Sequence, residues 1–174
     1  IINEVYDYNT AREKAITKAK EKILEKYPNI KDITNIKIIK EYVSKDNSSK
    51  LITDDFDYIV DTIDSIHDKL SLISEAVHKD IPIISSMGTG DKFDPTLFEV
   101  TDISKTSSCP FAHLLKSELK KLGIEHLKVI YSKEKPTRFR STESSYRANA
   151  SSISFVPSVA GLIISSEVVK DLIN

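Results

Sequence analysis

The sequence contains a single cysteine, Cys109, among its 174 residues. One cysteine cannot form a disulfide within the chain, and it cannot supply the four thiolates of a Cys-only zinc site. The two C-x-x-C pairs that are typical of many structural zinc sites are absent for the same reason. We therefore expect a protein without a structural zinc ion.

Long apolar runs are also missing. No stretch approaches the roughly 20 apolar residues that a membrane-spanning helix needs, and no signal-peptide pattern opens the chain. With 40% hydrophobic and 29% charged residues, the composition is typical of a globular protein with a sizeable core. We expect a cytoplasmic protein without a membrane segment. Because the first residue is Ile1 rather than Met, we also expect that a segment preceded it.

Neither charge sign dominates the chain, whose formal net charge is −1. The charges are unevenly spread, however: residues 54–102 hold 12 acidic and 3 basic side chains, and residues 105–147 hold 10 basic and 4 acidic ones. Acidic groups suit a metal ion and basic groups suit phosphates, so the two segments are candidates for different partners. The alternative is that both segments form ordinary solvated surfaces.

Hydrophobic periodicity predicts an alternation of helices and strands. The predicted helices span residues 9–27, 66–78, 110–122 and 157–173, and one or two helical turns are expected at 46–52. The predicted strands span residues 36–43, 57–63, 83–87, 98–103, 127–131 and 152–155. This order favours an α/β fold with a Rossmann-like, largely parallel sheet flanked by helices.

We expect one domain over residues 1–174. Residues 132–151 show no periodicity and predict an exposed or mobile connection. In the last predicted helix, the residues expected to face the core are Val159, Leu162, Ile163, Val169 and Leu172.

Two carboxylates, Asp61 and Asp64, stand at the carboxyl end of a predicted buried strand. In open α/β sheets that edge is where ligands bind, and a carboxylate there can hold magnesium on the phosphates of a nucleotide. Lys69 follows about one helical turn further and could approach a phosphate. The alternative is structural, because Asp64 or Ser65 is also suited to cap the helix that follows.

Two further features have a weak functional signal. The loop Gly88-Thr89-Gly90 permits a close backbone approach to a ligand, but so short a G-x-G is more often a plain turn. Cys109 precedes Pro110 at a predicted helix start, where a thiol pKa is lowered, but a lone cysteine is more often structural. The four histidines show no metal-ligand spacing.

A basic stretch in the later part of the chain is a candidate RNA-binding surface, because cations among aromatic side chains suit phosphate contact and base stacking. The alternative is a solvated helix face and loop. The residues that we expect to contact RNA are Lys116, Lys120, Lys133, Lys135, Arg138 and Arg140.

Four segments together resemble one family. DYIVDTIDS (57–65) resembles the V-x-D-x-x-D strand of the ThiF/MoeB/HesA superfamily and of ubiquitin-activating enzymes. SSMGTGDKFDPTLFEVTDISKT (85–106) and CPFAHLLKSELKKLGIEHLKVIYSKEKP (109–136) resemble its threonylcarbamoyladenosine dehydratase branch more specifically. SISFVPSVAGLIISSEVVKDL (152–172) resembles the closing strand and helix of that branch. The missing C-x-x-C pairs agree, since the MoeB and ThiF branches usually hold zinc with them and the dehydratase branch does not.

The resemblance implies an ATP-dependent reaction on tRNA. In that family ATP adenylates the carboxylate of threonylcarbamoyladenosine beside the anticodon, and an internal atom then closes a ring and expels AMP. Ring closure is fast because the nucleophile is already tethered. By the family motif, Asp64 is the catalytic residue that serves the Mg²⁺ ion and the ATP phosphates. Lys69 falls where the superfamily often has an arginine, and Lys14 is the counterpart of a phosphate-contacting helix lysine, with Ala15 as the alternative register.

The chain departs from the family pattern in its first part. The family's G-x-G-x-x-G turn, its acidic ribose residue and its N-R-Q arginine do not occur here. Since the backbone N–H groups of such a turn hold phosphates, we expect the chain to be the carboxyl-terminal portion of a ThiF-type fold, or a truncated relative. Family members are usually dimers, so the resemblance also implies a homodimer.

Two other functions stay open from the sequence. One is a related enzyme that adenylates the carboxyl terminus of a ubiquitin-like or sulfur carrier protein. The other is a binding or dimerisation module without catalytic activity. An intact G-x-G-x-x-G segment encoded upstream would favour the dehydratase, and a natural start near Ile1 would favour the module.

Overall fold

The computed structural model describes residues 14, 17, 18, 21, 25, 39–135 and 151–173. The chain divides into two compact units, Ile1–Glu41 and Tyr42–Asn174. In the first unit, every described residue from 14 to 25 is helical and exposed, as the helix predicted over 9–27 requires. Whether residues 1–174 form one domain stays a prediction.

The second unit is built on a sheet of four strands in the order β1-β2-β4-β3. Its strands are β1 (Ile59–Asp61), β2 (Ile83–Ser86), β3 (Phe98–Asp102) and β4 (Lys128–Ser132). β1, β2 and β4 run parallel, and β3 pairs with β4 in the antiparallel direction. The predicted α/β class with a largely parallel sheet is therefore confirmed.

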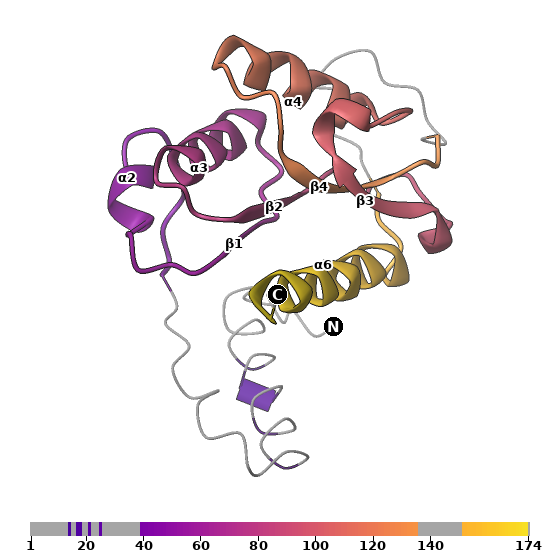
Figure 1. Ribbon diagram of the computed structural model, residues 1–174. Coiled ribbons are helices and arrows are strands. Elements are labelled where there is room, and N and C mark those ends of the chain that lie inside the picture. Colours follow the sequence, from indigo (N-terminus) through magenta and orange to yellow (C-terminus); the bar gives the residue numbers. More distant parts are fainter. Residues whose placement is uncertain are drawn as a thin grey trace, which may run out of the picture. The chain divides into compact units, whose positions relative to one another are not determined.

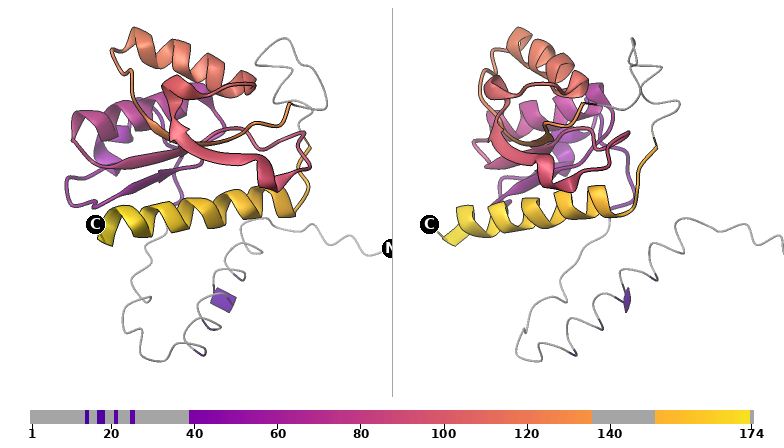
Figure 2. Two further views of the ribbon diagram at one scale, coloured as in Figure 1. Left: turned by 45° about the vertical axis from the view of Figure 1, so that its right-hand side comes forward. Right: turned by 90° about the vertical axis from the view of Figure 1, so that its right-hand side faces the viewer.

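Helices cover both faces of the sheet (Figures 1 and 2). The helices α3 (Ile66–His78) and α4 (Pro110–Lys121) lie on one face, and α6 (Phe155–Ile173) lies on the other. The described residues of this unit also form three short helical segments: α2 (Ser48–Leu51), η1 (Pro95–Leu97) and η2 (Ile103–Lys105). A parallel sheet needs cover on both faces, because its strands are apolar on both sides.

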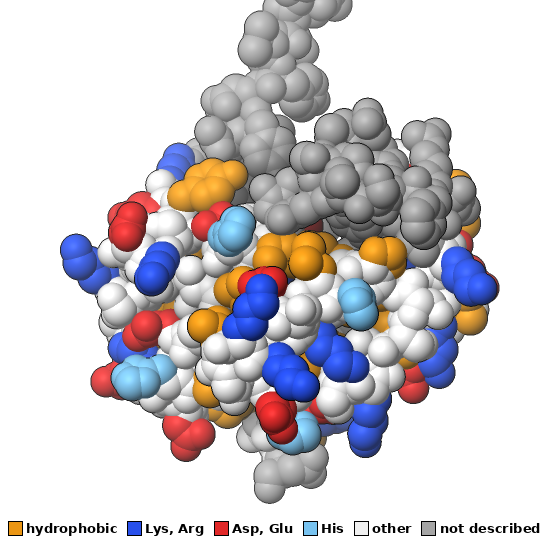
Figure 3. All heavy atoms as spheres, turned by 90° about the horizontal axis from the view of Figure 1, so that it is seen from above, with side chains coloured by type: hydrophobic (Ala, Val, Ile, Leu, Met, Phe, Trp, Pro, Cys, Tyr) orange, Lys and Arg blue, Asp and Glu red, His pale blue; other side chains and the backbone are white. Residues whose placement is uncertain are grey.

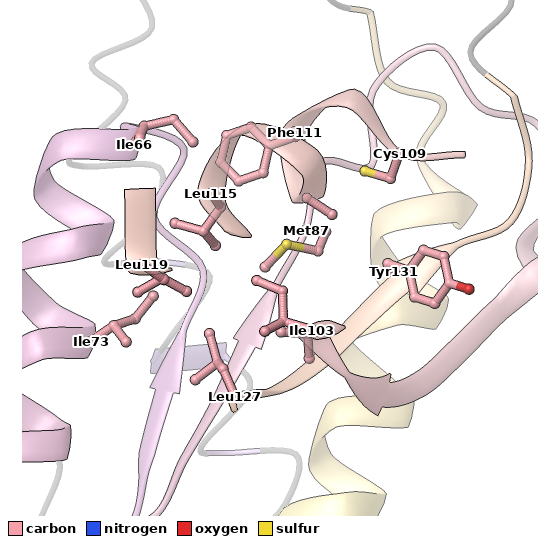
Figure 4. Packing of buried hydrophobic residues seen from close by; sticks show 12 residues of the cluster. Ile66, Ile73, Met87, Ile103, Cys109, Phe111, Leu115, Leu119, Leu127 and Tyr131 are labelled. Atoms are coloured by element: carbon pink, nitrogen blue, oxygen red, sulfur yellow. The ribbon is translucent and has the colours of Figure 1, made fainter. Parts of the chain in front are cut away.

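The largest core cluster fills the space between the sheet and the helices α3 and α4 (Figure 4). Ile73 comes from α3, Leu115 and Leu119 come from α4, and Val129 comes from β4; none of these side chains is exposed. Burying one such side chain contributes about 1.5–3 kcal/mol. This cluster therefore holds both helices against the strands whose carboxyl ends carry the candidate residues.

Residue chemistry at the helix ends explains the bounds of α3 and α4. The Ser65 hydroxyl accepts from the Asp68 amide at 3.5 Å and caps α3, so Ser65 rather than Asp64 is the capping residue. Pro110 opens α4, where its missing N–H costs nothing. Gly123, with φ of 75°, ends it in the left-handed region. Both helices lie where the sequence predicts them.

The inward face predicted for the last helix is wrong at Leu162, Val169 and Leu172 and right at Ile163, which packs against a core cluster of β2 and β4. The buried residues of α6 are Val156, Ala160 and Ile164, spaced four apart, whereas the predicted Leu162 is 70% exposed. Val169 and Leu172 are also exposed, and Val159 and Ile163 are half-buried. The helix is apolar on several sides, so periodicity alone could not select the side that packs on the sheet.

Charged side chains hold the carboxyl end of α6 against the sheet. Lys128 of β4 lies 3.0 Å from Glu167 and 2.8 Å from Asp171 of α6. The Tyr58 hydroxyl donates to Asp171 at 2.6 Å. These contacts fix the end of the helix where its apolar stripe is no longer buried.

Two predicted strands are not found. Residues 151–153 do not form a strand: the amide and hydroxyl of Ser151 donate to Asp91, and the helix begins at Phe155. Residues 39–43 of the strand predicted at 36–43 are not in a sheet, and residues 36–38 lie outside the described residues. No helix in the described part of the chain is both long and apolar enough to cross a membrane.

Candidate functional site

The carboxyl ends of β1 and β2 are joined by a buried polar network. Asp61 ends β1, Ser85 lies beside it in β2, and both are fully buried. Lys69 of α3 brings its Nζ to 2.6 Å from Asp61 Oδ2, 3.1 Å from Ser85 Oγ and 3.0 Å from the Ser86 carbonyl oxygen. The Ser85 hydroxyl donates to the same Asp61 oxygen at 2.6 Å. One lysine therefore ties two strands and a helix together.

The surroundings of Lys69 differ from those that the sequence predicts. The sequence predicts a lysine that approaches a phosphate, but all of its N–H groups are used within the protein, and its side chain is 0% exposed. Burial lowers the pKa of Lys69, while the carboxylates of Asp61 and Asp64 oppose that shift. The Nζ also lies 5.9 Å from the centre of the Phe111 ring of α4. Its predicted contact with a nucleotide stays a prediction.

Asp64 lies three residues beyond β1 and is exposed. The second oxygen of Asp61 accepts from the Ile63 amide at 2.9 Å, which fixes the backbone turn that leads to Asp64. No hydrogen bond or ion pair joins Asp64 to another residue in the described ranges. Because Ser65 caps the helix, the Asp64 carboxylate is left available for a ligand at this edge of the sheet.

The loop after β2 is held in place by three side chains. Lys92 donates from Nζ to the Gly88 carbonyl oxygen at 2.9 Å. Asp91, whose φ is 58°, is tied to Ser151 through its amide (2.8 Å) and its carboxylate. Glu134 accepts from the amides of Phe93 and Asp94 at 2.9–3.0 Å. The loop that contains Gly88-Thr89-Gly90 is therefore fixed by side-chain hydrogen bonds and is more than a plain turn.

Four of the lysines expected to contact RNA can be placed. Lys116 donates to the Ser104 carbonyl oxygen, and Lys120 is exposed on the same helix, α4. Lys133 lies 2.8 Å from Glu99, and Lys135 is exposed beyond β4. On the face seen in Figure 3, which looks down on Figure 1 from above, basic side chains lie among acidic ones. That mixture does not decide between an RNA surface and an ordinary solvated face.

For three other candidate residues, no position relative to the carboxyl edge of the sheet is given. Arg138 and Arg140 lie outside the described residues. Lys14 is helical and exposed, and it belongs to the first unit. Its predicted contact with phosphate stays a prediction.

Cys109 is 4% exposed and packs in the main core cluster, immediately before α4 (Figure 4). This placement favours the structural interpretation of the cysteine, because a reactive thiol needs access to its substrate. Within the described residues, no group of three or more His, Cys, Asp or Glu side chains could hold a metal ion.

The sequence did not identify Ser85, Lys92 and Glu134 as residues of the candidate site. Each is polar and sits at the carboxyl edge of β2 or β4, but only the folded chain brings them there. The one signal in the sequence was the segment 85–106, which contains Lys92. This segment supports the family resemblance but assigns no role to that lysine.

Comparison with known proteins gives consistent results. Residues 5–174 match the ThiF family. A Bacillus subtilis protein named tRNA threonylcarbamoyladenosine dehydratase is 37% identical over 148 residues, which are 78% of this chain and 58% of the relative. An Escherichia coli protein of the same name is 31% identical over 100 residues, 58% of this chain and 37% of the relative.

The fold is also shared with solved structures. The structure of the Escherichia coli enzyme TcdA in complex with AMP superposes with a TM-score of 0.72 at 24% identity. The match covers 88% of this chain and 62% of that protein. The chain thus spans less than two thirds of the length of the relatives that it matches.

Proposed function

Because this chain belongs to the ThiF family, we propose that it is part of an ATP-dependent dehydratase that cyclises threonylcarbamoyladenosine in tRNA. The observation that carries the proposal is the 37% identity with the Bacillus subtilis dehydratase over most of this chain. Two yeast relatives with the same activity in their names, 43% and 38% identical over shorter stretches, support the same substrate.

The proposed reaction removes one water from the modified nucleoside. The carboxylate of threonylcarbamoyladenosine attacks the α-phosphate of ATP, and pyrophosphate leaves. An atom of the same nucleoside then attacks the activated carbonyl, the ring closes, and AMP leaves. Tethering of the nucleophile makes the second step fast, so the main tasks of the protein are to bind ATP and to align the carboxylate.

Asp64 is the proposed catalytic residue and Mg²⁺ ligand. Mg²⁺ on a nucleotide is typically held by one or two carboxylates together with phosphate oxygens and water, so a cluster of protein ligands is not needed. An exposed carboxylate at the carboxyl edge of a parallel strand fits that donor set. The role of Asp61 and Lys69 in this proposal is to hold the turn that presents Asp64.

The remaining parts of the proposal concern partners. Lys14 contacts the ATP phosphates, and the tRNA backbone lies across the basic residues of the later chain. We further propose that the protein is a cytoplasmic homodimer, as its family resemblance implies. The tRNA-contacting residues in this proposal are Lys116, Lys120, Lys133, Lys135, Arg138 and Arg140.

Mass spectrometry of digested tRNA tests the proposal directly. tRNA that carries threonylcarbamoyladenosine is incubated with ATP and Mg²⁺, and loss of one water from the nucleoside is measured. The assay is run with this chain and with the natural protein that contains it, whose intact mass is determined alongside. Cyclisation by the natural protein, lost in Asp64→Asn, is the expected result. If the natural protein binds ATP but leaves the nucleoside unchanged, the proposed substrate is wrong.

A further inference from the structure

Two of the described lysines are completely buried, and their surroundings differ. Lys69 and Lys92 are 0% and 1% exposed. Lys69 has a carboxylate, a hydroxyl and a carbonyl as partners. Among the described residues, Lys92 Nζ hydrogen-bonds only to the Gly88 carbonyl oxygen, at 2.9 Å, and no carboxylate among them lies within ion-pair distance of it. Among the described residues, a carboxylate neutralises the Lys69 ammonium and none neutralises that of Lys92.

An unneutralised buried ammonium needs an explanation. Lysine is almost never fully buried unless it is paired, because removing a cation from water is costly. An ammonium has three N–H donors, and the Gly88 carbonyl takes one of them. A carbonyl oxygen supplies a dipole but no negative charge. Within the part of the chain that the structure describes, Lys92 therefore has neither a counter-charge in ion-pair distance nor acceptors for its other N–H groups.

We infer that Lys92 binds an oxyanion, a carboxylate or phosphate group of the substrates, at the carboxyl edge of β2. The inference rests on the proposed function, whose reaction brings both kinds of oxyanion to one place. β1 and β2 are parallel and in register at Asp61 and Ser85, so the segments that follow them, with Asp64 and Lys92, leave the same edge of the sheet. A metal-binding carboxylate and an anion-binding amine at one edge suit an adenylation reaction.

The backbone on each side of Lys92 is fixed, which positions its amine. The Asp91 amide donates to the Ser151 carbonyl oxygen at 2.8 Å. Glu134 accepts from the amide of Phe93, the next residue after Lys92. A side chain whose backbone is held on both sides is suited to bind a ligand with little loss of entropy. The amine is covered in the absence of a ligand, so binding requires a local rearrangement around it.

The test measures anion binding without catalysis. Thermal unfolding of this chain is followed with increasing inorganic phosphate and, separately, with increasing acetate, and sodium chloride keeps the ionic strength constant. Either anion is expected to raise the unfolding temperature of the wild type. Lys92→Met is expected to weaken that binding about ten- to a hundredfold, as for loss of a charged hydrogen bond. A response to phosphate alone or to acetate alone identifies which oxyanion the site takes.

Two variants separate this role from a structural one. Lys105→Met removes an exposed lysine and is expected to keep the full anion response. Lys92→Met should unfold, without anion, at a temperature close to that of the wild type, because it loses the bond to the Gly88 carbonyl oxygen but also removes a buried charge. Absence of any anion response in the wild type, or an equal response in Lys92→Met, would overturn the inference.

Two further measurements keep the inference testable. If Lys92→Met does not fold, the side-chain NMR signal of Lys92 in the wild type replaces it: that signal must shift on addition of the anion, and an unmoved signal refutes the site. Cyclisation assays then separate the two proposals. Cyclisation by the natural protein with an unchanged KM in Lys92→Met refutes the anion site alone. Lys92-dependent anion binding without cyclisation refutes the dehydratase function alone.

Discussion

Replacing Lys69 with methionine is expected to destabilise the chain strongly. The substitution leaves the Asp61 carboxylate fully buried, with only the Ser85 hydroxyl and the Ile63 amide as donors. Removing one partner of a buried ion pair costs about 3–5 kcal/mol. That is a large part of the roughly 5–15 kcal/mol by which a domain is usually stable. The unfolding temperature should fall by about 6–20 °C, at about 2–4 °C for each kcal/mol in a chain of this size.

Urea unfolding monitored by circular dichroism measures this effect. Lys121→Met serves as the control, because the Lys121 side chain is 66% exposed and its pair with Glu118 lies on the surface. That control should cost about 0–1 kcal/mol. The double substitution Asp61→Leu with Lys69→Met should recover much of the loss, since apolar residues often replace a buried ion pair without cost. A loss below about 1 kcal/mol in Lys69→Met would refute the reasoning, because that is the value of an exposed pair.

Three further predictions concern stability. Hydrogen bonds from Lys128 and Tyr58 lower the pKa of Asp171, so the stability from this contact is present above the ordinary value of 3.8 and is lost as the pH falls through the lowered pKa. Acid titration of unfolding should therefore show a shallower loss in Lys128→Met, and an unchanged titration would contradict this. Gly123→Ala should lower the free energy of unfolding, measured by chemical denaturation, by about 1 kcal/mol. The cause is the φ of 75°, since the space for a methyl group is open. An unchanged free energy would show that the turn relaxes. Ser65→Ala should cost about 0.5–2 kcal/mol, whereas Ser65→Asp should not, and equal stability of all three chains would exclude a capping role.

Local signals predicted most of the second unit. Ser65, Pro110 and Gly123 mark helix ends by their own chemistry, so the bounds of α3 and α4 agree with the structure within a residue. Short apolar runs located the four strands of the sheet. What failed was the choice of face in α6, where apolar residues occur on several sides and only contact with the sheet selects Val156 and Ala160.

The candidate site was predicted less completely than the fold. Asp64 was identified because a carboxylate at a strand end is a local feature. The partners of Lys69 could not be identified, since Asp61 and Ser85 are 8 and 16 residues away along the chain and meet it only through strand pairing. For Lys92 the sequence shows a lysine in a polar loop, which normally means an exposed side chain. The backbone on either side of it is held by contacts of Asp91 with Ser151 and of Phe93 with Glu134, which no local pattern reveals.

The position of β1 in the sheet has a consequence for how the chain behaves in concentrated solution. In the described part of the chain, β1 pairs only with β2, so its other side is an open edge. Such an edge is a template for a strand from another molecule, and charged side chains or proline usually protect against this. β1 is short, but its central residue, Val60, is 46% exposed and apolar. When the chain is purified alone, self-association through this edge should therefore lower its solubility. Val60→Lys is expected to reduce that association.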